Sequence, residues 1–107
     1  MPTVYEIVRD AIVNKKIVRA IYDGHERIMC PHVLGTKKGR PQALFYQFGG
    51  TSSSGLSPDG SPSNWRCLFL DLLEDVSSQD ANGQWHTAPN HSRPQTCVDN
   101  IDVEVTF

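Results

Sequence analysis

Apolar positions near the start of the chain recur at helical spacing. Between residues 3 and 15 they follow the i, i+3, i+4, i+7, i+8 pattern that predicts an amphipathic helix with one buried face. The positions are Val4, Ile7, Val8, Ala11 and Ile12. Thr3 and Glu6 have the spacing of a capping box, which satisfies backbone N–H groups at a helix start. About three helical turns are too short to be stable alone, so we expect this face to pack on a sheet.

The pattern then changes to extended runs rich in β-branched and aromatic residues. Residues 17–22 and 27–30 form two such runs, and Asp23-Gly24 between them tolerates the positive φ of a tight turn. Pro31 has no N–H to donate to a neighbouring strand, so it predicts either the end of the second run or an edge position. Together these features predict an antiparallel hairpin. A polar turn between glycines, residues 35–39, follows it.

Three further segments of the chain have the pattern of strands. Residues 43–48 and 65–70 are almost continuously apolar and predict a third and a fourth strand. Residues 71–76 resemble a short helical turn that leads into another brief strand. The tail 101–107 alternates strictly, which predicts a half-buried strand at a sheet edge. Its apolar face consists of Ile101, Val103, Val105 and Phe107.

Short sequential strands with tight turns and one helix predict a mainly β fold with an N-terminal α-helix. We expect a small, strongly bent antiparallel barrel, with an open antiparallel sheet covered by a helix as the alternative. The chain is long enough for one domain. The predicted organisation is a single domain 1–107, with a helix in 1–16, a barrel core in 17–78, a flexible Gly/Ser/Pro-rich loop in 49–64, an irregular segment in 79–100 and an edge strand in 101–107.

Charge and apolar content exclude some classes of protein. Ten Lys and Arg against 12 Asp and Glu argue against a broad electrostatic grip on duplex DNA, which needs many phosphate contacts. No run of about 18 apolar residues predicts a membrane span, and the N-terminus lacks the pattern of a secretion signal. We therefore expect no membrane association.

The cysteines predict a reduced setting. Cys30, Cys67 and Cys97 are far apart and odd in number, so they indicate neither a disulfide framework nor a metal site. We expect Cys30 and Cys67 to pack as small apolar residues, and we expect a cytoplasmic protein.

Aromatic and arginine side chains on the predicted strands are the candidate ligand-binding residues. Aromatic faces stack on bases, and arginine forks match phosphates or carboxylates. The candidates are Tyr22, Arg27, His32, Tyr46, Gln47, Trp65 and Arg66. The simpler reading makes the rings part of the core and lets His32 stabilise its turn. Arginines within apolar strands must point to solvent or be paired, because an unpaired buried charge is costly.

The sequence predicts no catalytic site, no metal and no cofactor. No Gly-x-Ser-x-Gly elbow and no HExxH pair is present, and His86 and His91 have the wrong spacing for one helical face. The glycine-rich start of the loop, residues 49–55, offers N–H groups for an anion but lacks the Gly-Lys-Ser/Thr of a P-loop. A flexible solvated loop is the alternative. We expect a protein that is not an enzyme.

Several short motifs together resemble the WYL domain. They are Ala20-Ile21-Tyr22, Arg27, Pro31-His32, Leu44-Phe45-Tyr46, Trp65-Arg66 and Leu70-Asp71, spread over residues 12–76. The resemblance implies an Sm-like small β-barrel that senses a nucleic acid or nucleotide in bacterial transcription regulators and phage-defence proteins. Leu44-Phe45-Tyr46 stands at the family's Trp-Tyr-Leu signature, and Phe69 and Leu72 stand where the family has arginines.

These observations support two hypotheses about function. The first is a non-enzymatic module that senses a ligand by binding single-stranded nucleic acid or a nucleotide-like anion, in bacterial regulation or phage defence. The second is a protein–protein module in which the tail strand 101–107 pairs with a partner or with a second copy, because unpaired strand edges template association.

Overall fold

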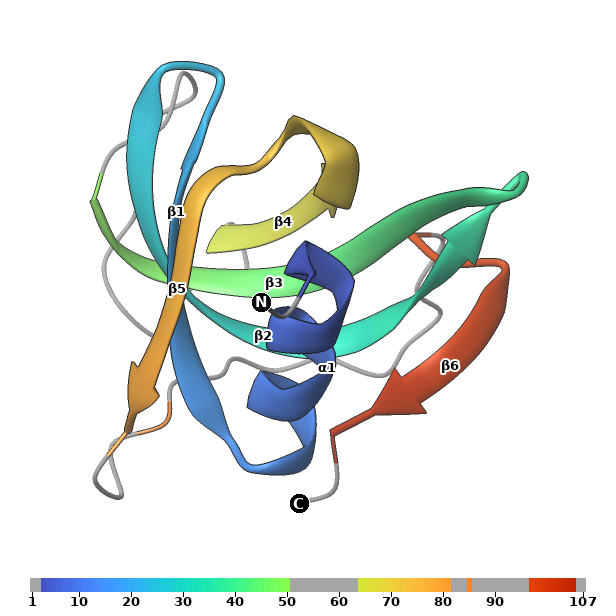
Figure 1. The fold of residues 1–107 in the computed structure, drawn as a ribbon, viewed down its shortest axis with the longest axis horizontal. Coiled ribbons are helices and arrows are strands. Elements are labelled where there is room, and N and C mark those ends of the chain that lie inside the picture. Colours follow the sequence, from blue (N-terminus) through green and yellow to red (C-terminus); the bar gives the residue numbers. More distant parts are fainter. Residues whose placement is uncertain (1–2, 51–63, 82–84, 86–96, 106–107) are drawn as a thin grey trace.

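The computed structural model describes residues 3–50, 64–81, 85 and 97–105. In this part of the chain one helix precedes a six-stranded antiparallel sheet (Figure 1). The elements are α1 (Val4–Val13), β1 (Lys16–Tyr22), β2 (His25–Lys37), β3 (Arg40–Gly50), β4 (Trp65–Phe69), the 3-10 turn η2 (Leu70–Leu72), β5 (Glu74–Asp80) and β6 (Asn100–Glu104). The predicted class, mainly β with an N-terminal helix, is confirmed.

The sheet has the strand order β4-β3-β2-β1-β5, and β6 pairs separately with β2. β4 and β5 are the two outermost strands of the sheet, yet η2 and Leu73 alone connect them in the chain. The sheet therefore bends so that its two outermost strands approach each other (Figure 1). Among the described residues, backbone pairing between β4 and β5 does not close this arrangement into a barrel. The sheet is therefore bent as predicted, and its closure stays a prediction.

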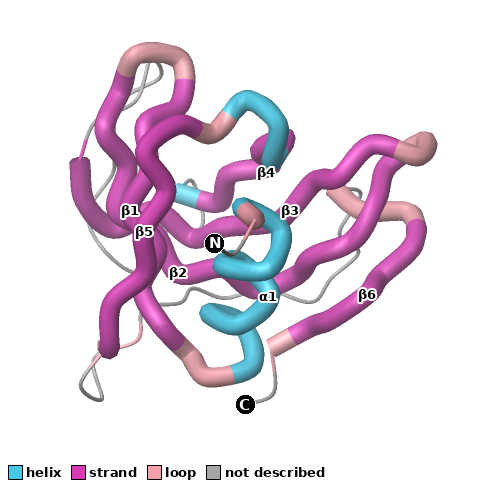
Figure 2. Tube along the Cα trace, in the orientation of Figure 1, coloured by secondary structure: helices cyan, strands magenta, loops and turns pink. Residues whose placement is uncertain are grey.

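Helix α1 begins and packs as its sequence pattern predicts. The Thr3 hydroxyl accepts from the Glu6 backbone N–H at 3.1 Å, and a Glu6 carboxylate oxygen accepts from the Thr3 N–H at 3.0 Å. Val8, Ala11 and Ile12 are at most 1% exposed. They lie in one core with Val18, Met29 and Phe45, among others, and Figure 2 shows the helix crossing the sheet over its central strands.

Of the two positions predicted for Pro31, the strand end is wrong, because β2 continues through it to Lys37. The edge position agrees with the structure, because among the described strands Pro31 pairs only with Phe45 of β3. Pairing with β1 ends at Met29, and a register shift against β3 follows between Pro31 and Val33. Pro31 therefore stands where the hydrogen-bond ladder is already interrupted, which is the position in a sheet that tolerates proline. His32 lies in this bulge, with Nδ1 2.8 Å from the carbonyl oxygen of Cys30.

The polar turn predicted for residues 35–39 is shorter in the structure. Between β2 and β3 only Lys38 and Gly39 form the turn, with φ of 51° and 80°. Gly35 lies inside β2, where a Cβ would overlap the carbonyl oxygen of Asn100 in β6. The Asp23-Gly24 turn is confirmed, with φ of 55° and 76°.

The predicted loop 49–64 and irregular segment 79–100 are also shorter in the structure. Gly49 and Gly50 end β3, and Asn64 is fully buried before β4. Residues 79 and 80 belong to β5, and residue 100 begins β6. Positions 51–63, 82–84 and 86–96 lie outside the described residues, so the predictions made for them stay predictions.

The tail forms a strand as predicted, but its alternation is broken. A register shift between Leu34 and Gly35 changes the face of β6. Val105 is 7% exposed and packs in the core with Val103, whereas Ile101 is 50% exposed. Phe107 lies outside the described residues. Within the described part of the chain, no helix is long and apolar enough to cross a bilayer.

Asp102 of β6 attaches the tail strand to the helix. The Tyr5 hydroxyl donates to its Oδ2 at 2.5 Å, and Arg9 Nε lies 3.3 Å from the same oxygen. Burial, followed by this hydrogen bond, raises the pKa of Tyr5 to about 12. The contact links the first helix to the last strand across most of the chain.

We expect Tyr5 to make stability fall at high pH. Because its pKa in the folded state exceeds the ordinary value of 10.0, its contribution is complete below pH 10 and is lost between pH 10 and 12. The check is urea unfolding of wild type and Tyr5→Phe at pH 8, 10 and 11.5. The wild type should lose more stability over this range than the variant. Parallel pH curves for the two proteins would contradict the assignment.

Candidate functional site

The register of the sheet assigns each predicted site residue to one of two faces. Directly paired residues of antiparallel strands share a face. Arg27 pairs with Ala20, Gln47 with Met29 and Arg66 with Phe45. Since Ala20, Met29 and Phe45 all belong to the core beneath α1, these three polar residues project to the inner side of the sheet. Tyr22 packs against the same core.

The inner arginine cluster consists of Tyr22, Arg27, Gln47 and Arg66. The guanidinium carbon of Arg27 lies 5.1 Å from the centroid of the Tyr22 ring. Arg66 Nη1 donates to the carbonyl oxygen of Trp65 at 3.2 Å, and Gln47 Nε2 donates to that of Gly49 at 2.9 Å. The structure therefore brings together four of the seven predicted residues, including both arginines.

Arg27 is a buried cation beside a second cation. Arg27 is only 4% exposed, and its Nε is buried without a hydrogen-bond acceptor. Burial and then the nearby charge of Arg66 lower the pKa of Arg27, while Tyr22 and Asp23 act in the opposite direction. Burial also lowers the pKa of Arg66. Among the described residues, no carboxylate forms an ion pair with Arg27.

This environment differs from both outcomes that the sequence allows for an arginine in an apolar strand. Arg27 neither points to solvent nor pairs with a carboxylate of the described chain. Holding a guanidinium out of water costs several kcal/mol unless an anion compensates it. Two adjacent guanidinium groups increase that cost, because like charges repel. Within the described residues, no carboxylate ion pair offsets this cost at Arg27.

The remaining three predicted residues, His32, Tyr46 and Trp65, form a separate outer aromatic cluster together with Trp85. His32 stacks on Trp85 with ring centroids 4.2 Å apart and meets the edge of Trp65 at 4.7 Å. Tyr46, paired with Trp65 across β3 and β4, contacts it at 5.1 Å. His32 and Tyr46 are fully buried, so this cluster is a packed layer on the opposite face of the sheet. Sequence reasoning missed Trp85, whose only signal is an aromatic residue within a polar segment.

The predicted absence of a disulfide is wrong. Cys67 of β4 is bonded to Cys97, which lies just before β6. Cys67 is also exposed rather than packed in an apolar strand, whereas Cys30 is buried as predicted. The two bonded cysteines are brought together because the chain before β6 runs along β2, where the Asp99 N–H donates to the Thr36 carbonyl oxygen at 2.8 Å. This pairing is long-range and leaves no local sequence signal.

No family model, no curated protein and no solved structure matches the chain. Within the described residues, no group of His, Cys, Asp or Glu could hold a metal ion. The physical chemistry of the two clusters is thus the basis for any function assigned here, and the inner arginine cluster is the better candidate.

Proposed function

We propose that this protein binds a phosphate-bearing anion, a nucleotide or a segment of single-stranded nucleic acid, at the inner arginine cluster. The observation that carries the proposal is Arg27, buried to 96% of its surface, adjacent to Arg66 and without a carboxylate of the described chain. An anion between the two guanidinium groups would satisfy the buried Nε and offset the repulsion. Bidentate pairing of arginine with phosphate oxygens is the strongest form of such a contact.

The resemblance to the WYL domain supports the same ligand class. Arg27, Tyr22 and Arg66 belong to the motifs that carry the resemblance, and they are the residues that come together at the inner face. The family's arginines at the end of the fourth strand are absent from this chain, so binding is proposed to depend on Arg27 instead. An Sm-like barrel, a ligand-sensing role without catalysis, and a setting in bacterial transcription regulation or phage defence complete the proposal.

Titration calorimetry at low salt tests the proposal with two probes, inorganic pyrophosphate and a single-stranded octanucleotide. We expect Arg27→Met and Arg66→Met each to weaken pyrophosphate binding about tenfold or more, since a charge-assisted hydrogen bond contributes roughly 1.5–3 kcal/mol. The matched control is Arg19→Met, an exposed arginine on β1 that is outside the cluster. Equal affinities for the wild type and both cluster variants would end the proposal.

One further control tests whether a carboxylate of the chain itself forms an ion pair with the arginines of the cluster. Residues 51–63 connect β3 to β4 and contain a single carboxylate, Asp59. If an internal ion pair occupied the arginines, Asp59→Asn would free them, and pyrophosphate would bind the variant more tightly than the wild type. Unchanged affinity in Asp59→Asn is expected.

The alternative of association through the tail strand has less support from the geometry. One edge of β6 already pairs with β2, and Asp102 is held by Tyr5 and Arg9. The carboxylates of Asp102 and Glu104 are also the kind of charge that discourages edge-to-edge pairing. We retain self-association through β6 as a second proposal, and light scattering tests it. The expected result is a dimer that forms with increasing concentration in the wild type and does not form in Ile101→Asp.

A further inference from the structure

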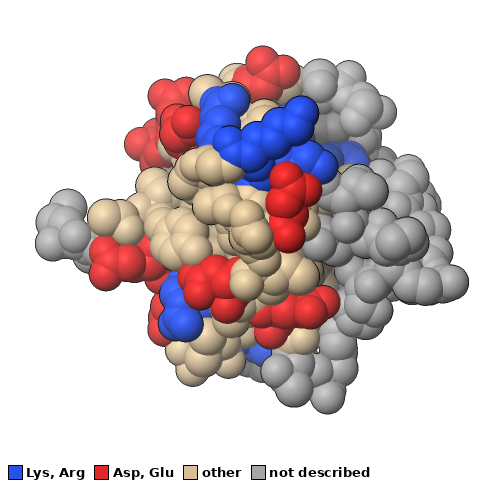
Figure 3. Space-filling view, turned by 90° about the vertical axis from the view of Figure 1, so that its right-hand side faces the viewer, with Lys and Arg blue, Asp and Glu red and all other residues tan. Residues whose placement is uncertain are grey.

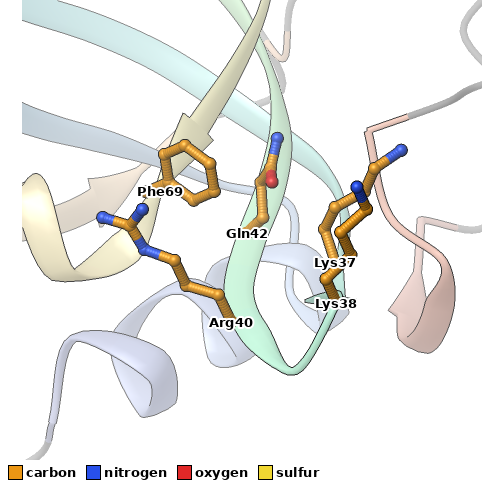
Figure 4. Close-up of a pocket in the computed structure, with 5 residues that line it drawn as sticks. All are labelled: Lys37, Lys38, Arg40, Gln42 and Phe69. Carbon is orange, nitrogen blue, oxygen red and sulfur yellow. The ribbon is translucent and has the colours of Figure 1, made fainter.

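A second cationic surface lies far from the inner arginine cluster, at the turn between β2 and β3. It surrounds a hollow of about 430 Å³. The residues that line it are Lys37, Lys38, Arg40, Gln42 and Phe69. Figure 4 shows the two lysines on one side of the hollow and Arg40 with Phe69 on the other. Figure 3 views the molecule from the side of this turn and shows Lys and Arg side chains gathered at the upper end.

Arg40 forms a flat platform at this hollow. Its guanidinium carbon lies 3.8 Å from the centroid of the Phe69 ring. Three contacts of 3.0 to 3.3 Å between its Nε and Nη2 and the Asp71 carboxylate fix the plane of the group. The side chain of Arg40 is still 44% exposed. One face of the guanidinium is therefore covered by a ring, and the group is held ready to stack on a second planar molecule.

The lysines place positive charge across the hollow from that platform. Lys37 Nζ lies 3.6 Å from Asp99 Oδ1, and the same carboxylate accepts from the backbone N–H of Lys38 at 3.2 Å. Asp99 thereby fixes the turn that carries both side chains. The ammonium of Lys38 makes no ion pair within the described part of the chain. It is the cation best placed to meet an incoming anion.

The floor of the hollow is stiffened by the disulfide. Gln42 pairs with Phe69 across β3 and β4 and is 7% exposed. Its Nε2 lies 3.1 Å from the sulfur of Cys67 and 3.5 Å from that of Cys97. Arg40 and Gln42 lie on β3, and Phe69 lies on the paired strand β4. The Cys67–Cys97 disulfide connects β4 covalently to the segment before β6. A site held this rigidly loses little freedom when a ligand binds.

We propose that this hollow is a separate site for a phosphate attached to an aromatic base, with the base stacked on Arg40 and the phosphate at Lys38. The shared chemistry is that of a free nucleotide or of one residue of a single strand. The site lies on the outer side of β3 and β4, because Gln42 and Phe69 pair across these strands on the face of Leu44 and Cys67, opposite Phe45 and Arg66. It does not depend on the inner arginine cluster, and either site can exist without the other.

The test uses the monophosphate of 2-aminopurine riboside, whose fluorescence is quenched when its base stacks. It is performed on the full chain carrying Arg27→Met, so that the inner cluster does not contribute. We expect quenching on binding, and we expect Arg40→Lys to weaken binding at least about fivefold, because lysine keeps the charge but lacks the plane. Arg19→Lys is the matched control and should leave the affinity unchanged. Lys38→Ala should weaken binding without changing the quenching at saturation.

Two competitors separate the sources of the ligand. Ribose 5-phosphate, which has no base, should displace the probe at least about fivefold less well than adenosine monophosphate. An octanucleotide that binds more tightly than adenosine monophosphate assigns the site to single strands, and equal affinity assigns it to free nucleotides. Absence of quenching, or equal affinity of Arg40→Lys and its parent, would overturn the proposal.

Discussion

Arg27→Met is expected to stabilise the ligand-free protein by about 1–4 kcal/mol, against the usual effect of a core substitution. The buried guanidinium costs free energy of desolvation, and the nearby Arg66 adds repulsion. Methionine fills a similar volume without charge and removes both costs. A site that keeps such a charge without a partner trades stability for binding, and this substitution measures that trade directly.

Urea unfolding at pH 7 measures the change, first in a buffer without multivalent anions. Arg19→Met, on the exposed side of β1, serves as the control and should remain within about 0.5 kcal/mol of wild type. Adding pyrophosphate at a hundredfold excess over the wild-type Kd should then stabilise the wild type by about 2.7 kcal/mol and Arg27→Met, whose binding is at least tenfold weaker, by about 1.4 kcal/mol or less. A variant that is clearly less stable than the wild type without ligand would show that Arg27 is a satisfied structural residue.

Reduction of the Cys67–Cys97 disulfide is expected to cost about 3–4 kcal/mol of stability. The bond closes a loop with a sequence separation of 30, and a constraint of that length removes substantial entropy from the unfolded chain. Unfolding by urea with and without a reducing agent measures the loss. The double variant Cys67→Ala with Cys97→Ala should have the stability of the reduced protein and should not respond to the reducing agent. Identical unfolding curves of oxidised and reduced wild type would contradict the expectation.

The disulfide also changes the argument about cellular setting. The cytoplasmic location predicted from three unpaired cysteines loses that basis, because disulfides persist mainly in oxidising compartments. Cys30, the remaining one of the three cysteines, is not part of the disulfide and is buried. The cytoplasmic setting therefore remains a proposal that depends on the resemblance to bacterial regulators, and measuring the redox state of Cys67 in cells would test it.

Local features of the fold could be predicted from the sequence because they depend on neighbouring residues. The capping box at Thr3 and Glu6 and the positive φ at Asp23-Gly24 are set by side chains within a few positions of each other. The strands near residues 17–22, 43–48 and 65–70 follow from continuous apolar runs. What failed in these elements was their ends, since pairing with a neighbouring strand extended β2 and β3 through residues without a strand pattern.

The grouping of the candidate site residues could not be predicted, because it depends on the register between strands and on one bulge at His32. Gln47 shares the inner face with Phe45 by simple alternation along β3, and the register shift at Phe48 lies beyond it. Another shift at His32 places its ring against Trp65 and Trp85, away from Leu34 two residues later. A bulge of this kind sets the face of a residue that alternation misplaces, whereas alternation alone separates Tyr46 from Gln47 and Trp65 from Arg66. The two arginines share the inner face because Arg27 pairs with Ala20 and Arg66 pairs with Phe45, and both partners belong to the inner core.

The most direct test of the central claim is the 15N-edited NMR signal of the Arg27 Nε–H group during a pyrophosphate titration. This N–H is buried without an acceptor, so a bound anion must give it a new hydrogen bond. We predict a saturable shift of the Arg27 signal, assigned by its loss in Arg27→Met, while the Arg19 signal stays in place. A signal of Arg27 that does not move at millimolar pyrophosphate would contradict the proposal that this arginine binds an anion.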